Sequence, residues 1–280
     1  MRRSLLWLCL LGLPLRLVAA EKAKPEPPLR TRAEVEAVLS QGVGKGKIRP
    51  LNIVLVASAQ DHGVGEHDYP AWQKAWNPLL SRSEHVTVTN AWEWPTPEQF
   101  QKADVIVFYF WYHKWTNDVY KQVEAFLGRG GGIALLHSSS IADHDPEALA
   151  ERIGISFQPK RSKYRHGELD LEFTTPKNDP LTLGLPRRIH FLDETYWPMI
   201  GDTNRVHVLA TAQEEQKPWP MLWTFEPGKG RVFGTVLGHY LWTYDDPFFR
   251  ILILRGIAWA AREPVSRLEP LATVGVHFKD

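Results

Sequence analysis

Short apolar runs alternate along the chain with segments whose apolar residues recur at helical spacing. The runs cover residues 51–58, 104–110, 133–136 and 231–237, and each is almost wholly apolar. Such runs are typical of strands that are covered on both faces, while the spacing between them is typical of amphipathic helices. The alternation predicts an α/β fold: a three-layer αβα sandwich around a mainly parallel sheet with right-handed crossovers.

Local signals place the first half of the elements. Thr31 and Glu34 form a capping-box pattern for a helix over residues 31–39. Apolar residues from Trp72 to Leu80 indicate a second helix, which Pro78 should kink or restart. An alternating strand is expected over residues 85–90, a short helix over 95–100, and a helix that begins at Thr116 or Asn117 and ends at the glycines 128 and 130.

The pattern is looser after residue 137. Asp145 and Pro146 start a helix that should end near Gly154. Strands are predicted over residues 168–173, directly after His166 and Gly167, and over 206–211 and 221–225. A final helix capped by Asp246 is apolar nearly all round and should be deeply buried, and the tail from residue 262 should be loop with a peripheral strand.

The amino terminus has the pattern of a secretory signal. Arg2 and Arg3 precede an apolar core over residues 5–13, and the small residues 18–20 offer a cleavage site. We therefore expect export to a periplasm or the extracellular space, with cleavage near Ala20. The apolar core is too short for a transmembrane helix, so no membrane insertion of the mature chain is expected.

Composition then excludes several kinds of chemistry. The single cysteine, Cys9, lies within the expected signal, so the mature chain would have neither thiol catalysis nor disulfides nor cysteine metal sites. The 33 basic and 32 acidic residues nearly cancel, and no nucleic-acid partner is expected. The twelve tryptophans either fill a large core or form platforms for sugar rings, and the oligomeric state stays open.

Histidines follow the predicted strands at the positions where α/β sheets bind ligands. His113 follows the run at 104–110, His137 ends the run at 133–136, and His239 follows the run at 231–237. Residues far apart in sequence can meet there, because the carboxyl ends of parallel strands share one edge. The alternative for His137 is a residue that only caps a buried strand by a hydrogen bond.

The loop after the first strand, residues 59–70, carries His62, Glu66, His67 and Asp68 together with two glycines. This density of titratable groups favours a binding or catalytic role over a solvated surface loop. Residues 191–197 place Asp193 and Glu194 between aromatic side chains. These carboxylates either serve the site or simply pair with Arg165 or Arg231.

Three separated segments resemble the trehalose-utilisation (ThuA-like) family. They are GGGIALLH at 130–137, DETYW at 193–197 and the long run from GKGRVFG to GIAWAA at 228–261, and the resemblance extends from about residue 48 to 262. It implies a flavodoxin-like fold similar to class I glutamine amidotransferases, and it links the chain to disaccharides oxidised at C3. Amidotransferases carry a cysteine nucleophile at the turn after this strand, where the chain has His137, so amidotransferase chemistry is not expected.

The expected domain organisation follows from these signals. Residues 1–20 form the signal peptide, 21–47 a linker with a short helix, 48–265 the ThuA-like domain and 266–280 a tail. No GxSxG elbow supports a serine hydrolase, and the glycines at 128–132 precede a strand instead of opening a helix, as a phosphate loop would.

The candidate active site combines three elements that the sequence keeps apart. We predict that His137, Glu194 and His239 are catalytic and face one pocket, and that other residues contact the substrate, a small carbohydrate. Those residues are His62, His67, His113 and His166 around the rim, with Tyr240 and Trp242 against the sugar ring. The predicted reaction is isomerisation or cleavage of a keto sugar or keto glycoside by histidine and glutamate acid–base chemistry. Assistance by a divalent metal and a non-catalytic carbohydrate-binding or scaffold role remain alternatives.

Overall fold

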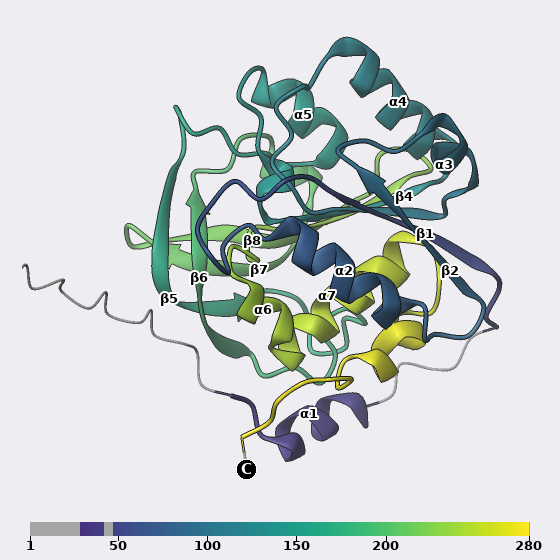
Figure 1. The fold of residues 1–280 in the computed structure, drawn as a ribbon. Helices are drawn as coiled ribbons and strands as arrows, with labels where there is room; N and C mark the ends of the chain where they lie inside the picture. Colours follow the sequence, from purple (N-terminus) through teal and green to yellow (C-terminus); the bar gives the residue numbers. More distant parts are fainter. Residues whose placement is uncertain (1–28, 42–46, 280) are drawn as a thin grey trace, which may run out of the picture.

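A nine-stranded sheet runs through the molecule (Figure 1). The structure, a computed structural model, describes residues 29–41 and 47–279. The strands in chain order are β1 (Leu51–Ala57), β2 (Val86–Trp92), β3 (Val105–Phe108), β4 (Gly132–Leu136), β5 (Lys163–Phe173), β6 (Arg188–Trp197), β7 (His207–Glu214), β8 (Lys217–Phe225) and β9 (Arg231–Thr235). Across the sheet they are ordered β2-β1-β3-β4-β9-β8-β7-β5-β6.

The sheet has a parallel half and an antiparallel half. Strands β2, β1, β3, β4 and β9 pair in parallel. The strands β8, β7, β5 and β6 continue the sheet in antiparallel pairs. The α/β class with a parallel core is confirmed, and the antiparallel half agrees with the looser, alternating sequence after residue 137.

Helices cover both faces of the sheet and complete three layers. The helices are α1 (Arg32–Leu39), α2 (Tyr69–Leu80), α3 (Pro97–Lys102), α4 (Asn117–Gly128), α5 (Pro146–Ile153), α6 (Leu241–Asp245) and α7 (Pro247–Ala260), with 3-10 turns η1 (His137–Ser140), η2 (Thr203–Arg205) and η3 (Val265–Leu271). Figure 1 shows α3, α4 and α5 on one face, with α2 and α7 on the other. Helix α7 is buried on nearly every side, as its uninterrupted apolar sequence predicts.

The helix starts follow the predicted capping residues. Thr31 and Glu34 form the reciprocal capping box of α1, Thr116 caps α4 and Asp246 caps α7. Each side chain accepts a hydrogen bond from a backbone N–H that the first helical turn leaves without a partner.

Two local predictions were wrong, and a third was open between two outcomes. Helix α2 continues through Pro78, so of the expected kink or restart the restart does not occur. Strand β5 begins at Lys163, which places His166 and Gly167 inside the strand, because its residues pair with β6 from Lys163 onward. The tail, expected to be loop with a peripheral strand, instead begins with η3, whose Leu268 and Leu271 are buried, and makes only a single β-bridge at Lys279.

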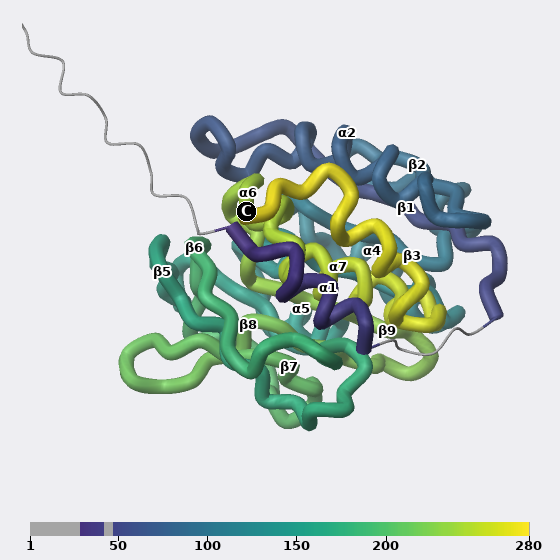
Figure 2. Tube along the Cα trace, turned by 90° about the horizontal axis from the view of Figure 1, so that it is seen from below, coloured from purple at the N-terminus to yellow at the C-terminus, as the bar shows by residue number. Residues whose placement is uncertain are grey.

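The two ends of the described chain lie side by side. The Lys279 N–H donates to the Arg30 carbonyl at 2.9 Å, and Thr31 and Lys279 form a parallel bridge. Figure 2 shows α1 next to the C-terminal segment. The expected signal peptide and residues 21–28 and 42–46 of the expected linker lie outside the described residues. No helix within 29–41 or 47–279 is long and apolar enough to cross a membrane.

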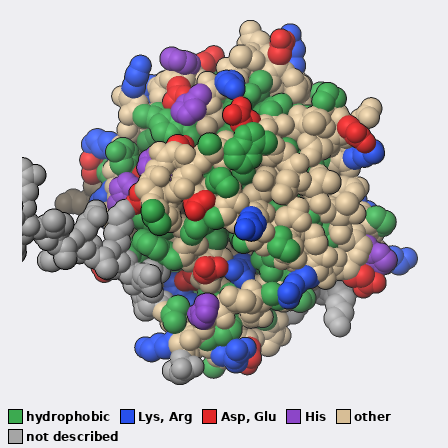
Figure 3. Space-filling model, in the orientation of Figure 1, with side chains coloured by type: hydrophobic (Ala, Val, Ile, Leu, Met, Phe, Trp, Pro, Cys, Tyr) green, Lys and Arg blue, Asp and Glu red, His purple; other side chains and the backbone are tan. Residues whose placement is uncertain are grey.

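Charges of both signs are mixed over the surface. Lysine and arginine side chains are interspersed with aspartate and glutamate over the face drawn in Figure 3. Many of the tryptophans serve the core: Trp72, Trp76 and Trp223 are at most 2% exposed, whereas Trp92 is 55% exposed.

Candidate functional site

The sharp turn after β4 places His137 at the centre of the molecule. His137 is fully buried, and its backbone has a φ of 52°, which is unusual for a residue other than glycine. Its Nδ1 atom lies 2.6 Å from the carbonyl oxygen of Val236, which can only accept, so Nδ1 carries the hydrogen. The ring is therefore fixed with Nε2 pointing into the site.

His67 reaches the same point from the loop between β1 and α2. The loop is joined to the segment after β9 by hydrogen bonds from His67 N to His239 O at 3.0 Å and from Leu241 N to Gly65 O at 2.9 Å. The His67 Nδ1 atom lies 2.7 Å from the Asp61 carboxylate, which holds the hydrogen on Nδ1 and leaves Nε2 free. His67 is 2% exposed, so the prediction that it lies on the rim was wrong.

Asp193 positions His239. Its carboxylate accepts hydrogen bonds from the backbone N–H of Gly238, at 3.1 Å, and of His239, at 3.0 Å, and from the Thr243 hydroxyl. A carboxylate that accepts hydrogen bonds from several donors of one segment holds that segment in place, and Asp193 so fixes the backbone at His239. Burial raises the pKa of Asp193, against the opposing effect of His137 and these donors.

Glu194 comes from β6, where it lies opposite His166 of β5. Its Oε2 atom is 3.3 Å from His137 Nε2 and 3.1 Å from His239 Nδ1. The alternative that this acidic pair serves two arginines is wrong, because Arg165 bonds Glu214 and Arg231 bonds Glu226.

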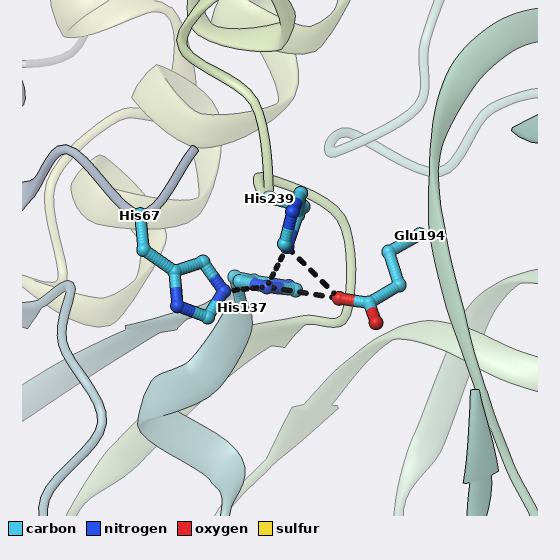
Figure 4. Close-up of side chains that lie close together, drawn as sticks. All are labelled: His67, His137, Glu194 and His239. Atoms are coloured by element: carbon cyan, nitrogen blue, oxygen red, sulfur yellow. Dashed lines mark hydrogen bonds and ion pairs between the residues drawn. The ribbon is translucent and has the colours of Figure 1, made fainter. Parts of the chain in front are cut away.

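The four buried side chains converge on one point (Figure 4). The Nε2 atoms of His67 and His137 are 2.8 Å apart, and His239 Nδ1 is 3.3 Å from His137 Nε2. One ligand atom from each of His67, His137, Glu194 and His239 lies within 4.8 Å of the other three, so the group could hold a metal ion. None of these four residues is more than 4% exposed.

The electrostatics of the group favour neutral His67 and His239 beside an ionised Glu194. Burial lowers the pKa of His67 to about 4 and the pKa of His239 to about 3. Burial alone would raise the pKa of Glu194, but hydrogen bonds to His137 and His239 hold it well below its ordinary value. For His137, burial is outweighed by Glu194, which raises the pKa, so His137 is the imidazole that most readily holds a proton.

The predicted rim residues divide between the site and the outside. His62 lies over His67 with ring centroids 3.9 Å apart, and His166 Nε2 is 3.4 Å from Glu194 Oε1. Tyr240 bonds His166 at 3.1 Å, and its ring stacks on Trp242 at 4.0 Å. These residues border the buried group.

His113 is not brought to the group by any contact that the structure describes. Its Nδ1 atom pairs with Asp143 at 2.6 Å and its ring packs against Trp111, with the side chain 57% exposed. Strand β3 is shorter than predicted and ends at Phe108, so four residues outside the strand precede His113.

Sequence analysis missed three residues that support the site. Asp61 accepts from both His62 and His67, and the Tyr69 hydroxyl lies 2.8 Å from His67 Nδ1 and 3.0 Å from Ser138. The Tyr196 hydroxyl lies 3.2 Å from His137 Nε2. The position of Asp61 within the histidine-rich loop was the available signal for it, whereas nothing in the sequence pattern singled out Tyr69 or Tyr196.

Comparisons with known proteins bear on the family and the fold. The family model described as ThuA, trehalose utilisation, matches residues 53–260, which is more than half of the chain. No curated protein matches the chain significantly.

Solved structures with the same fold include two ThuA-like proteins. The one from Parabacteroides merdae is 20% identical with a TM-score of 0.60, covering 76% of this chain and 90% of its own. The one from Bacteroides uniformis is 13% identical with a TM-score of 0.61, covering 80% and 98%. A β-galactosidase from Rahnella sp. R3 is 15% identical with a TM-score of 0.53, covering 76% of this chain but 32% of the enzyme. At these identities the likeness shows the fold alone.

Proposed function

The chain belongs to the ThuA family of trehalose utilisation, and we propose that it is a metal-dependent enzyme that isomerises or cleaves an oxidised sugar. The substrate class is a keto sugar or keto glycoside, as the resemblance to the family implies. The observation that carries the proposal is the convergence of His67, His137, His239 and Glu194 in a buried site. In this proposal the four residues act as metal ligands and not as independent acid–base catalysts.

The ligand geometry supports a divalent transition metal. Donor atoms about 2.1 Å from a tetrahedral ion are about 3.4 Å apart. The contacts of His239 with His137, at 3.3 Å, and with Glu194, at 3.1 Å, are close to this separation. Imidazole and carboxylate together suit manganese, iron, cobalt, nickel or zinc.

The surroundings of the rings support the same assignment. Metal-binding histidines usually donate their other N–H to a carboxylate or a backbone carbonyl. His67 has Asp61 in this position and His137 has the carbonyl of Val236. His239 Nε2 is buried and makes no hydrogen bond among the described residues, and its nearest acidic group is Glu66 Oε1 at 3.8 Å.

Catalysis also needs a free coordination position. Four protein ligands fill a tetrahedral site, as in structural zinc centres. An ion with five or six ligands leaves positions for a substrate oxygen. We place those positions toward His62 and His166, whose side chains are 37% and 40% exposed, because the other sides of the group are buried.

The proposed chemistry follows from a ketone next to an acidic C–H. A metal ion held by His67, His137, Glu194 and His239 would supply a Lewis acid for the ketone oxygen, and this would make the neighbouring C–H more acidic. Trp242, which is partly exposed, would contact the sugar ring. Tyr240 is 5% exposed and stacked on Trp242, so it supports this contact from behind.

Metal analysis and a substrate screen test the proposal together. The chain is purified without a histidine tag, its metal content is measured, and the chelated protein is reloaded with manganese, iron, cobalt, nickel or zinc. Methyl 3-keto-glucopyranoside and 3-keto-trehalose are then followed by NMR. We expect one equivalent of metal and turnover only by the loaded protein, while His137→Ala loses both.

The alternative is a non-catalytic carbohydrate-binding or scaffold protein. It requires aromatic platforms but no convergence of buried histidines with lowered pKa values, and such groups favour catalysis. If His137→Ala and His239→Ala bind these sugars as tightly as the wild type, and no loaded form turns them over, this alternative holds. Cobalt spectra separate a closed four-ligand site from one with free positions.

We also propose that the protein is exported and cleaved near Ala20. The basic start and short apolar core of residues 1–20 support this. Determining the N-terminal residue of protein recovered from an envelope fraction tests it, and an uncleaved chain confined to the cytosol would contradict it.

A further inference from the structure

Asp61 holds two histidines with one oxygen atom. Its Oδ1 atom lies 2.7 Å from His62 Nδ1 and 2.7 Å from His67 Nδ1. A carboxylate oxygen accepts, so each ring donates its Nδ1 hydrogen and keeps its Nε2 lone pair. The two rings therefore share a tautomer, but the Nε2 atom of His67 points into the buried group, 2.8 Å from His137, whereas that of His62 does not reach it.

His62 differs from the buried ligands in its accessibility. Its side chain is 37% exposed, and its ring lies 3.9 Å from the ring of His67 and 5.5 Å from that of His239, between centroids. Within the described residues its Nε2 atom makes no hydrogen bond. An imidazole held in one orientation by Asp61 thus borders the candidate metal site, and its Nε2 atom is not tied to another described residue.

We propose that His62 is a further catalytic residue, the one that carries the substrate proton, with Asp61 as its positioning residue. This inference rests on the proposed function, since it needs a ketone bound at the four-residue site. The arrangement resembles an acid–base dyad in which a carboxylate fixes the tautomer of the reacting imidazole.

The proton balance closes without another reactant. The Nε2 lone pair of His62 takes the proton from the carbon next to the ketone, and the C–H electron pair forms the enolate. In isomerisation the hydroxyl proton on the deprotonated carbon passes to the former ketone oxygen, and His62 returns its proton to the former carbonyl carbon as a new carbonyl forms beside it. In cleavage the C3 carbonyl re-forms, the enolate double bond shifts to join C1 and C2, and the bond from C1 to the glycosidic oxygen breaks. That oxygen takes the proton from His62, which leaves an unsaturated ketone. Each route restores the neutral imidazole.

His166 is less suited to this role. Its Nδ1 atom bonds the Tyr240 hydroxyl at 3.1 Å and its Nε2 atom faces Glu194 at 3.4 Å, so both nitrogens already have partners.

Asp61 also links the two functions of its loop, because the same carboxylate orients a metal ligand, His67, and the proton carrier, His62.

Exchange of the substrate hydrogen with deuterated water tests the assignment directly. Metal-loaded wild type, His62→Gln and His207→Gln are incubated with methyl 3-keto-glucopyranoside in D2O, and NMR follows the C–H signal next to the ketone. His207 is a matched control, because it also pairs with a carboxylate, Asp179 at 3.2 Å, on the surface. A His62→Gly variant is assayed with and without added imidazole.

Loss of the proton carrier should slow exchange by about 10²–10⁴-fold with KM and metal content unchanged. Imidazole should restore part of the rate in His62→Gly, and His207→Gln should behave as the wild type. Exchange by His62→Gln at the wild-type rate, or loss of its metal, would overturn the assignment. Absence of exchange by metal-loaded wild type would instead overturn the proposed function itself.

Discussion

The Nε2 atoms of His67 and His137 lie 2.8 Å apart, although the Nδ1 atom of each ring already donates a hydrogen bond elsewhere. Two neutral rings with these tautomers would place one lone pair against the other. A proton or a cation must therefore lie between them. Without metal, the raised pKa of His137 and the ionised Glu194 beside it indicate a proton on His137.

Metal binding should therefore release about one proton, because metal ligands bind in their deprotonated forms. His67 and His239, with pKa values of about 4 and 3, are neutral at pH 7 and contribute none. Titration calorimetry with zinc in buffers of different ionisation enthalpy measures the number of protons released per metal ion bound. A value near three would show that all three imidazoles are protonated in the metal-free protein, contrary to this account.

Acid should destabilise the metal-free protein well before general acid unfolding. The unfolded chain protonates His67 and His239 near pH 6.5, whereas the folded chain does so only near pH 4 and 3. Stability due to these groups is present above pH 6.5 and is lost as the pH falls toward 4, by up to about 1.4 kcal/mol per pH unit for each group.

Urea unfolding of the chelated protein between pH 7 and 4.5 measures this slope. The His67→Gln and His239→Gln double variant should show a shallower dependence. His137 acts in the opposite sense, because its raised pKa stabilises the folded state at low pH. The lowered pKa values of His67 and His239 together outweigh this effect on the free energy of unfolding. An equally steep dependence in the double variant would disprove the assignment.

Asp61→Asn should weaken metal binding by about 10–100-fold, the usual cost of losing an outer partner of a ligand. The amide can no longer accept both Nδ1 hydrogens at full charge, so His67 loses its fixed orientation. Competition with a chromophoric chelator gives the affinity. His62→Gln is the control, because it contacts Asp61 but would not ligate the metal, and equal weakening by both variants would contradict the separate roles.

Much of the architecture could be predicted from the chain because the parallel strands are apolar runs with their own stop signals. The runs that end at Ala57 and Leu136 gave β1 and β4. His137 and His239 were found as site residues by position, since both follow strands that pair side by side in the sheet.

The rest depended on distances that the sequence does not contain. His67 lies inside the group because backbone hydrogen bonds tie its loop to residues 239–241, a contact between segments about 170 residues apart. Asp61 and Tyr69 acquire roles only through that docking. The length of strand β3 decides the position of His113, and its end could not be read from a run of aromatic residues.

Asp193→Ala should weaken metal binding although Asp193 is not a candidate ligand. The change leaves the buried N–H groups of Gly238 and His239 without an acceptor, at a cost of roughly 1–3 kcal/mol for each. The free energy of unfolding and the metal affinity should both fall. Asp246→Ala is the control: it also removes a buried carboxylate that caps backbone N–H groups, those of α7, and should lower stability while sparing metal affinity.

Gly238→Ala should displace His239. Gly238 has a φ of 120°, and an added Cβ would lie 2.4 Å from the Tyr244 hydroxyl oxygen. The carbonyl oxygen of Gly238 also accepts a hydrogen bond from the Tyr109 hydroxyl at 2.7 Å. Relief requires the backbone to move, and His239 moves with it. The strained conformation alone costs about 1–3 kcal/mol, and metal affinity should fall as well.

Gly228→Ala separates the two effects. Gly228 also has a positive φ, 61°, but nothing lies within 4 Å of an added Cβ. Its alanine variant should lose stability through backbone strain while binding metal as the wild type does, because the turn before β9 moves without the site. If Gly238→Ala keeps full metal affinity, the segment from 238 to 241 does not set the position of His239, and the ligand role of that histidine would have to be abandoned.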